Sequence, residues 1–122
     1  MKALLINGSP RQNGNTSIAL AEVAKTLEAE GIETEIFWLG TKPVRGCIGC
    51  GSCRTNQLGK CVFDDDVCNR LVERFATADA FVVGSPTYYG QPAGALLAVC
   101  YLCFLGYRFR IQETIDYENI AD

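Results

Sequence analysis

Four cysteines stand close together in the chain, at a spacing that could hold one metal centre. Their pattern, Cys47-x2-Cys50-x2-Cys53-x7-Cys61, spans fifteen residues and forms a glycine-containing Cys-rich loop at 46–61. Thiolates are soft ligands that suit an iron–sulfur cluster or a tetrahedral zinc ion. The spacing leaves three interpretations open: a cluster such as [4Fe–4S], a zinc site, or loop thiols that hold no metal.

A polar segment, NGSPRQNGNTS at residues 7–17, directly follows an apolar run. It offers hydroxyl groups, side-chain amides and a guanidinium at the expected start of a helix, where main-chain N–H groups and the helix dipole bind anions. It lacks the GxxxxGK(S/T) spacing of triphosphate-binding loops and the GxGxxG spacing of dinucleotide-binding loops. We expect a phosphate monoester site here; the alternative is a polar turn that only caps a helix.

A second segment, GSPTYYGQP at residues 84–92, follows another apolar run and has two adjacent tyrosines between prolines. Aromatic faces and exposed main-chain amides on a stiff backbone suit a flat heteroaromatic ring. The alternative is that the tyrosine rings cover the protein core, since large aromatic side chains are commonly buried.

The elements that must position these residues alternate between strands and helices. Residues 3–6 and 80–83 are short, continuous apolar runs, which are typical of strands buried on both faces. Residues 32–39 contain β-branched and aromatic residues and predict another extended segment. Residues 41–63, which contain the clustered glycines and cysteines, predict a long loop.

Three helices are predicted between these segments. The first is capped by Asn15 or Thr16 and stops at Gly31. The second follows the Asp run at 64–66, which we expect to cap the helix rather than to bind a metal. The third spans 93–105. The apolar stripe of the second helix is Val67, Leu71, Val72 and Phe75, and the cysteines expected in the core as small hydrophobes are Cys68, Cys100 and Cys103.

This alternation predicts a three-layer α/β/α fold with a doubly wound parallel sheet in one domain at 1–122. In a sheet of order 2-1-3-4-5, the first and third strands are neighbours at the topological switch point. The polar segment 7–17 and the aromatic segment 84–92 follow those two strands. We therefore expect them to form one cleft, with a ligand phosphate on one loop and a ring on the other.

The composition excludes several classes of function. The chain has 122 residues and no histidine, so it contains neither a Ser-His-Asp nor a Cys-His pair, and a bound cofactor or its thiols must supply the chemistry. A net charge of −3 argues against a nucleic-acid partner. Seven cysteines without a signal-peptide pattern predict a reducing cytoplasm. Glycines and prolines interrupt the uncharged stretch 80–107, so no membrane span is expected.

Three motifs together resemble one family. GSPRxxGNT at 8–16, CxGCxxC at 47–53 with a later GKC and Asp pair, and GSPTYYG at 84–90 are similar to the flavodoxin-like NAD(P)H-dependent FMN reductases, whose cysteine-bearing members are the iron–sulfur flavoproteins. The resemblance covers about residues 1–97 and implies a flavodoxin-like fold with bound FMN. The residues that it assigns to the FMN phosphate are Ser9, Arg11, Asn15, Thr16 and Ser17. Those that it assigns to the isoalloxazine ring are Pro86, Thr87, Tyr88, Tyr89 and Gly90.

The resemblance also implies a function. FMN would take a hydride from NADH or NADPH and pass electrons to an acceptor, with the protein supplying position and electronics. If Cys47, Cys50, Cys53 and Cys61 hold a [4Fe–4S] cluster, a ferredoxin-like redox partner becomes the favoured donor. Two alternatives stay open: a non-enzymatic flavodoxin-like electron carrier, and a truncated remnant that acts only through protein contacts.

Residues 98–122 depart from the family pattern. Residues 98–105 are uncharged where relatives place charged residues, and residues 107–111 predict at most one short strand where relatives add two strands and further helices. We therefore expect a flavodoxin-like sheet without its last strands. An uncovered third strand and an apolar helix favour self-association, so the chain is expected to form a homo-oligomer.

Overall fold

The computed structural model describes the backbone of residues 1–55 and 59–112 and the side chains of residues 1–55 and 59–103. Its centre is a parallel sheet formed by β1 (Lys2–Asn7), β2 (Glu33–Trp38) and β3 (Ala80–Gly84). The strand order is β2-β1-β3, as predicted. From Ala3 to Asn7, β1 is fully buried, because helices cover both of its faces.

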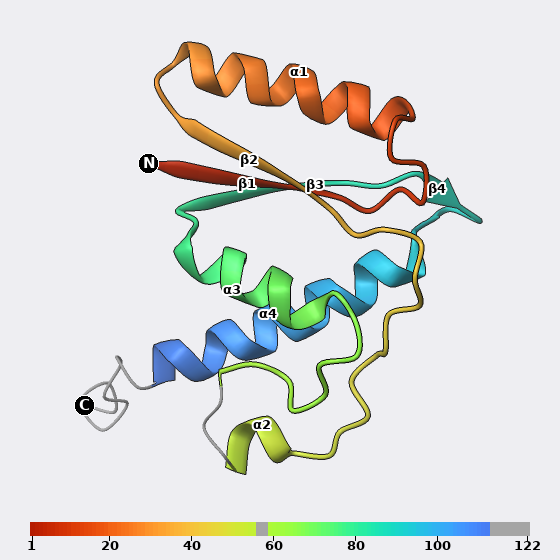
Figure 1. Ribbon diagram of the computed structural model, residues 1–122, viewed down its shortest axis with the longest axis vertical. Helices are drawn as coiled ribbons and strands as arrows, with labels where there is room; N and C mark the ends of the chain where they lie inside the picture. Colours follow the sequence, from red (N-terminus) through yellow and green to blue (C-terminus); the bar gives the residue numbers. More distant parts are fainter. Residues whose placement is uncertain (56–58, 113–122) are drawn as a thin grey trace.

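Helices lie on both sides of the sheet (Figure 1). One face is covered by α1 (Asn15–Ala29), and the other by α3 (Cys68–Thr77) and α4 (Gly94–Gln112). The side chains of β1 pack alternately into two hydrophobic cores, one on each face of the sheet, because successive strand side chains point to opposite faces. The α1 core contains Ala3, Leu5, Leu20 and Ala24; the larger core joins Leu4 and Ile6 to α3 and α4. This is the predicted three-layer arrangement.

The ends of α1 differ partly from expectation. Gly14 occupies the N-cap position with an extended backbone and no side-chain cap, so the predicted cap at Asn15 or Thr16 is wrong. The predicted stop at Gly31 is confirmed. Gly31 has φ +79°, and its N–H donates to Glu28 O while Ile32 N–H donates to Leu27 O, both at 3.0 Å. This bond pattern ends a helix with a glycine in the left-handed conformation.

The second predicted helix begins later than the Asp run suggests. α3 starts at Cys68, whose N–H donates a 2.8 Å hydrogen bond to Asp66 Oδ1. Asp64 and Asp65 bind other partners, Asn69 and Arg45 respectively. The predicted apolar stripe is confirmed, since Val67, Leu71, Val72 and Phe75 are all buried.

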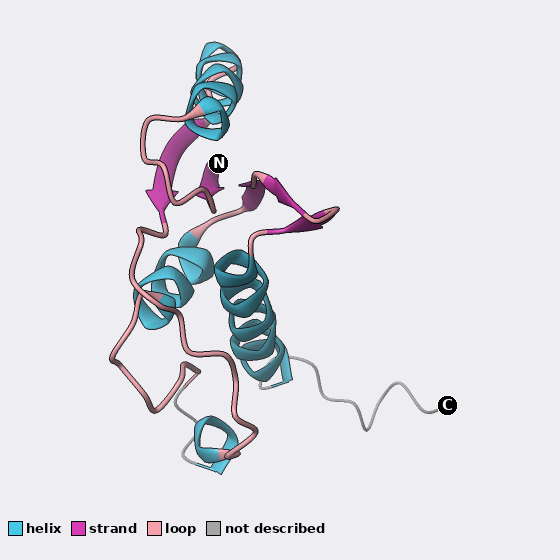
Figure 2. Cartoon of the chain, turned by 90° about the vertical axis from the view of Figure 1, so that its right-hand side faces the viewer, coloured by secondary structure: helices cyan, strands magenta, loops and turns pink. Residues whose placement is uncertain are grey.

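Two connections contain structure that the sequence did not predict. The long loop at 41–63 includes a single helical turn, α2 (Ser52–Thr55). The segment at 84–92 forms a hairpin of β4 (Thr87–Tyr88) and β5 (Gln91–Pro92), which projects from the end of the sheet (Figure 2).

The last helix is longer than predicted. α4 continues to Gln112, so the short strand expected at 107–111 is wrong. Adding a residue to an existing helix gains a hydrogen bond without a new nucleation cost, which explains why this segment stays helical. No described helix meets the length and apolarity required to cross a bilayer.

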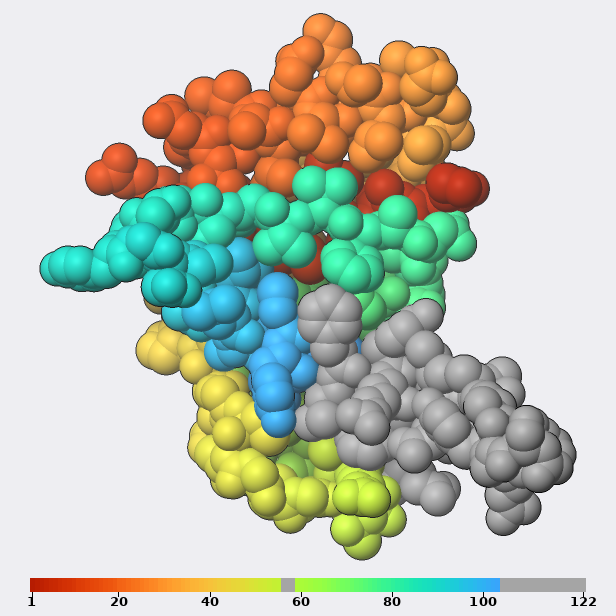
Figure 3. Space-filling view, turned by 180° about the vertical axis from the view of Figure 1, so that it is seen from behind, coloured from red at the N-terminus to blue at the C-terminus, as the bar shows by residue number. Residues whose placement is uncertain are grey.

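Within the described residues, β3 is an outer strand of the parallel sheet. It lies along the surface seen from behind in Figure 3, where residues 80–84 are green. Phe81 and Val83 are 45% and 42% exposed, although the sequence predicted a strand buried on both faces. An apolar strand at the edge of a sheet is open to pairing with another strand.

Candidate functional site

The polar loop and the hairpin meet at the carboxyl edge of the sheet. Gly8 N–H donates a 2.8 Å hydrogen bond to Gly84 O, which joins the residue that follows β1 to the last residue of β3. A Cβ on Gly8 would lie 2.9 Å from Leu96 Cδ2, and one on Gly84 would lie 2.9 Å from Thr16 Cγ2. Such close approach needs glycine at both positions, so the expected juxtaposition of the two segments is confirmed.

Ser9 is the most deeply placed residue of the predicted phosphate site. It is buried, its N–H donates to Asn7 Oδ1 at 3.0 Å, and its Oγ accepts from Arg11 N–H at 3.1 Å. Trp38 Nε1 donates to Ser9 O at 2.8 Å, which ties the loop to the end of β2. A serine hydroxyl that accepts one hydrogen bond keeps its own proton for donation to an anion.

The rest of the predicted phosphate set surrounds the start of α1. Arg11 and Asn15 are exposed, and Thr16 and Ser17 are half-buried in the first helical turn. The first N–H groups of a helix have no partner within it, and here Gly14 supplies no side-chain cap. The positive end of the α1 dipole therefore lies among hydroxyl, amide and guanidinium groups, an arrangement that suits a phosphate.

The predicted ring-binding residues form the exposed hairpin. Pro86 is half-buried, whereas Thr87, Tyr88, Tyr89 and Gly90 are exposed. At the tip Tyr89 has φ +50° and Gly90 has φ +77°, the left-handed pair that a tight hairpin turn requires. Tyr88 is 49% exposed and Tyr89 is fully exposed, so the alternative that both rings cover the core is wrong.

The base of this hairpin is closed by Ser85. Its Oγ accepts a 2.9 Å hydrogen bond from Ala93 N–H and donates a 2.8 Å hydrogen bond to Pro86 O. The same contact fixes the start of α4, since the N–H groups of Leu96 and Leu97 donate to Ala93 O. Hairpin and helix are thereby held in one geometry beside Gly84.

A polar hollow of about 690 Å³ begins at the end of β2, between residues 38–42 and residues 64–67 with Arg70. The residues predicted to bind phosphate or ring do not line it. The candidate flavin site is formed by a loop and a hairpin at the carboxyl edge of the sheet, and most of its predicted residues are exposed or half-buried.

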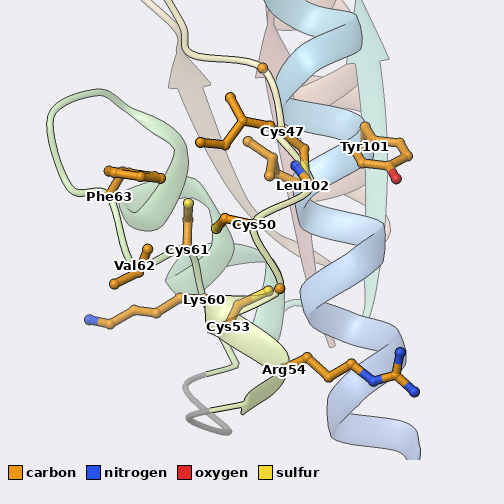
Figure 4. Close-up of a pocket in the computed structure, with 14 residues that line it drawn as sticks. Cys47, Cys50, Cys53, Arg54, Lys60, Cys61, Val62, Phe63, Tyr101 and Leu102 are labelled. Atoms are coloured by element: carbon orange, nitrogen blue, oxygen red, sulfur yellow. The ribbon is translucent and has the colours of Figure 1, made fainter.

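The four clustered cysteines line a second hollow of about 180 Å³, together with Tyr101 and Leu102 of α4. Figure 4 shows Cys47, Cys50 and Cys53 on one arm of the loop and Cys61 on the other. Cys47 and Cys50 are exposed, and Cys53 and Cys61 are half-buried. Within the described part of the chain, no three Cys, Asp or Glu side chains stand close enough to form a ready-made metal site.

The chemistry of this donor set fits a thiolate-bound centre. Four thiols face one hollow, and the glycines between them allow the first arm to turn, with Gly49 at φ +68° and Gly51 at φ +72°. Hydrogen bonds from the Ser52 side chain and N–H lower the pKa of the Cys50 thiol, which favours the thiolate that a metal requires. Binding a metal would require the two arms to close further.

Arg45 ties the two ends of the Cys-rich loop together. Its N–H donates to Asp66 Oδ2 at 2.8 Å, its guanidinium pairs with Asp65, and the guanidinium carbon lies 4.7 Å from the centre of the Phe63 ring. The Arg45 guanidinium lowers the pKa of Asp65, and the carboxylate in turn raises the pKa of Arg45. The loop therefore starts and ends at one fixed place beside α3.

The amino-acid sequence matches the model of a known protein family. The family model of NADPH-dependent FMN reductases matches residues 1–107. The chain belongs to this family. Its three-layer fold is accordingly the flavodoxin-like fold, and the motifs that resemble the family stand at the two loops of the sheet edge and in the Cys-rich loop.

Several curated relatives of this FMN reductase family member are iron–sulfur flavoproteins. One from Methanocaldococcus jannaschii is 41% identical over 96 residues, which is 79% of this chain and 48% of the relative. One from Archaeoglobus fulgidus is 43% identical over 91 residues, 73% of this chain and 39% of the relative. An FMN-dependent NADPH-azoreductase from Staphylococcus aureus is 31% identical over 96 residues, 79% of this chain and 48% of the relative. The chain thus spans about half the length of these relatives or less.

The remaining cysteines of the chain belong to the core, as predicted. Cys68 and Cys103 are buried between α3 and α4, and Cys100 is half-buried against the same core. Burial raises the pKa of all three thiols, that of Cys103 to about 12. They are neutral at physiological pH and behave as small apolar side chains.

Sequence analysis missed the residues that hold the site together. Trp38 and Arg45 act through partners that are distant in the sequence, whereas Ser85 and Asn69 each bind a residue eight positions away. The sequence contained one hint of the Arg45 ion pair. An arginine stands shortly before the Cys motif and a run of aspartates stands shortly after it, so opposite charges flank the loop. The other three residues have no such local signal.

Proposed function

We propose that this chain binds FMN at the carboxyl edge of its sheet and works as part of an NAD(P)H-dependent flavin oxidoreductase. The observation that carries the proposal is the hydrogen bond between Gly8 and Gly84, since it brings the polar loop and the aromatic hairpin to one edge. Membership of the NADPH-dependent FMN reductase family supports it. Bound FMN would accept a hydride from NADH or NADPH and release electrons to an acceptor.

Each of the two loops would bind a different part of FMN. The phosphate would be held by Ser9, Arg11, Asn15, Thr16 and Ser17 at the start of α1, where hydroxyls, the guanidinium and helix N–H groups converge. The ring would lie against the hairpin residues Pro86, Thr87, Tyr88, Tyr89 and Gly90. The exposed tyrosines and the stiff turn provide an aromatic surface for it.

We further propose that Cys47, Cys50, Cys53 and Cys61 hold a [4Fe–4S] cluster. Their common hollow and the lowering of the Cys50 pKa by Ser52 support this, as does similarity to proteins named iron–sulfur flavoproteins. A bound cluster would exchange single electrons, which makes a ferredoxin-type protein a suitable partner. Exposed free thiols at Cys47 and Cys50 suit a reducing compartment such as the cytoplasm.

A homo-oligomer is proposed on separate grounds. The half-exposed Phe81 and Val83 lie on a strand at the edge of the described sheet, and such edges pair with other strands. Size-exclusion chromatography with light scattering tests this, and a monodisperse monomer at high concentration would contradict it.

A visible absorption spectrum of protein purified without oxygen, before and after dithionite, tests the cofactors. Two flavin bands above a broad shoulder, all bleached by dithionite, support flavin and cluster together. Flavin bands alone remove the cluster, and zinc analysis of the same sample then decides whether zinc replaces it. A sample that stays colourless after FMN is added contradicts the flavin site. NADH or NADPH consumption with a soluble acceptor separates a reductase from an electron carrier.

A further inference from the structure

Asn69, the second residue of α3, connects the helix to the Cys-rich loop through a buried amide. The residue is 3% exposed. Its Oδ1 accepts a 2.9 Å hydrogen bond from Cys61 N–H, and its Nδ2 lies 3.0 Å from Cys61 O. The same Nδ2 group also donates toward Phe63 O at 3.1 Å and Asp64 Oδ1 at 3.2 Å. One side chain thereby holds both main-chain polar atoms of Cys61.

The support behind this amide is rigid. The α3 helix is fixed in the larger core by Leu71 and Val72, which are 0% and 5% exposed. Asn69 therefore holds Cys61 against a part of the molecule that cannot shift without disturbing the core. A buried amide that lost these partners would leave polar groups unsatisfied, so the contact is costly to break.

The other three cysteines lie on a different kind of backbone. The hydrogen bonds found within the described part of residues 46–55 are local, such as Gly49 N–H to Cys47 Sγ at 3.4 Å and Arg54 N–H to Gly51 O at 3.1 Å. Two of the residues between these cysteines, Gly49 and Gly51, have positive φ values. This arm can change its backbone angles at low steric cost.

We propose that Asn69 is a positioning residue that holds Cys61 as the fixed ligand of the iron–sulfur centre, onto which the glycine-rich arm with Cys47, Cys50 and Cys53 closes when iron is loaded. This inference rests on the proposed cluster. It explains why four thiols can line one hollow while no three of them within the described residues already form a metal site. One ligand is fixed in advance, and the other three gain their positions during loading.

Two variants of Asn69 separate positioning from general stability. Asn69→Asp keeps the shape and the Oδ1 acceptor but loses the donor to Cys61 O, Phe63 O and Asp64 Oδ1. Asn69→Leu removes all four contacts. Leu5→Ala is the matched control, because Leu5 is fully buried in the α1 core on the opposite face of the sheet. If Asn69→Leu fails to fold, Asn69→Asp decides the outcome.

Each protein is reconstituted without oxygen with ferric iron, sulfide and a thiol reductant that supplies the electrons needed for the mixed-valence cluster, then desalted. Iron and sulfide per chain are measured, followed by the chelator concentration that removes half of the iron. We expect that concentration to fall about ten-fold for Asn69→Asp and further for Asn69→Leu, the range seen when residues that orient metal ligands are replaced. The electron paramagnetic resonance signal of the reduced cluster should change for Asn69→Asp and stay unchanged for Leu5→Ala.

The outcomes distinguish the two proposals. A wild-type chain that takes up neither iron nor sulfide would overturn the cluster, and the role of Asn69 with it. A wild-type chain that loads, with Asn69 variants that retain iron equally well, would overturn the positioning role alone. Equal iron loss from the Asn69 variants and from Leu5→Ala at matched thermal stability would also overturn it, because a general loss of packing would then explain the effect.

Discussion

Gly8 and Gly84 lie so close together that the N–H of one donates to the carbonyl oxygen of the other at 2.8 Å. Gly8 directly follows β1, Gly84 ends β3, and each precedes a loop that we propose to bind the flavin. The start of α4 packs against the same point through Leu96. This contact therefore fixes the polar loop, the hairpin and a helix relative to one another.

Replacing Gly8 should disturb both stability and flavin binding. A Cβ there would lie 2.9 Å from Leu96 Cδ2 and 3.1 Å from Gly84 O, and the backbone oxygen cannot move aside easily. We expect Gly8→Ala to destabilise the fold by about 1–3 kcal/mol, the usual cost of overpacking. Thermal unfolding and FMN titration measure the two effects. Gly94→Ala is the control, because a Cβ there meets nothing within 4 Å and should be neutral or mildly stabilising.

The phosphate assignment predicts a difference between two flavins. Arg11→Gln removes a charged donor from the loop at the start of α1, so FMN binding should weaken about ten-fold, as for loss of a charge-assisted hydrogen bond. Riboflavin has no phosphate, and its binding should not change. Fluorescence titration with each flavin checks this, with the exposed Lys25→Gln on α1 as the charge-matched control. Equal weakening for both flavins would argue against phosphate contact at Arg11.

Tyr89 offers a variant in which stability and binding should move in opposite directions. A residue other than glycine pays about 1–2 kcal/mol for the left-handed conformation, and Tyr89 has φ +50° while its side chain is fully exposed. Tyr89→Gly should therefore raise the unfolding temperature. The loss of an aromatic face should weaken FMN and riboflavin alike. Unchanged flavin affinity would place the ring elsewhere.

The link between Arg45 and Asp65 predicts a pH dependence of loop closure. Because Arg45 lowers the pKa of Asp65 below its ordinary 3.8, the ion pair stabilises the folded loop above that pH and is lost as pH falls through the lowered pKa. Both groups are exposed, so the effect should be small and weakened by salt. Proteolysis of the Cys-rich loop should be slower in wild type than in Asp65→Asn at pH 6, and the difference should vanish at a pH below the lowered pKa of Asp65.

An acid-active protease makes that comparison feasible at both pH values. Glu22→Gln, which removes an exposed carboxylate from α1, serves as the control and should cleave like wild type. A difference between wild type and Asp65→Asn that is already lost at pH 5, well above 3.8, would contradict the ion-pair explanation.

The thiols should differ in reactivity according to their surroundings. Ser52 lowers the pKa of Cys50, which is exposed, whereas burial raises the pKa of Cys68 and of Cys103. Iodoacetamide at pH 7.5 should therefore label Cys50 well before the two core thiols in the metal-free protein, as mass spectrometry of peptides can show. Iron loading should protect Cys50. Rapid labelling of Cys103 in the folded chain would contradict the described packing of α3 on α4.

The pattern of apolar residues along the chain correctly predicted the elements with a buried strand or a buried helix face. The apolar run of β1 became a buried central strand, and the stripe from Val67 to Phe75 became the buried face of α3. Strand alternation then gave the order β2-β1-β3, and with it the meeting of the two ligand loops. The prediction of a strand at 107–111 was wrong. This segment directly follows the predicted helix, and extending α4 through it needs no new nucleation step.

The amino-acid sequence by itself determined the fold class, the two loops of the flavin edge and the four clustered thiols, because periodicity and spacing are local properties of a chain. Tertiary structure decided what holds them in place. Arg45 reaches Asp65 twenty residues away and Asn69 holds Cys61 from the next helix, and both contacts depend on where α3 packs. No local pattern encodes such a pairing, because it exists only after the core has fixed the distance between two segments.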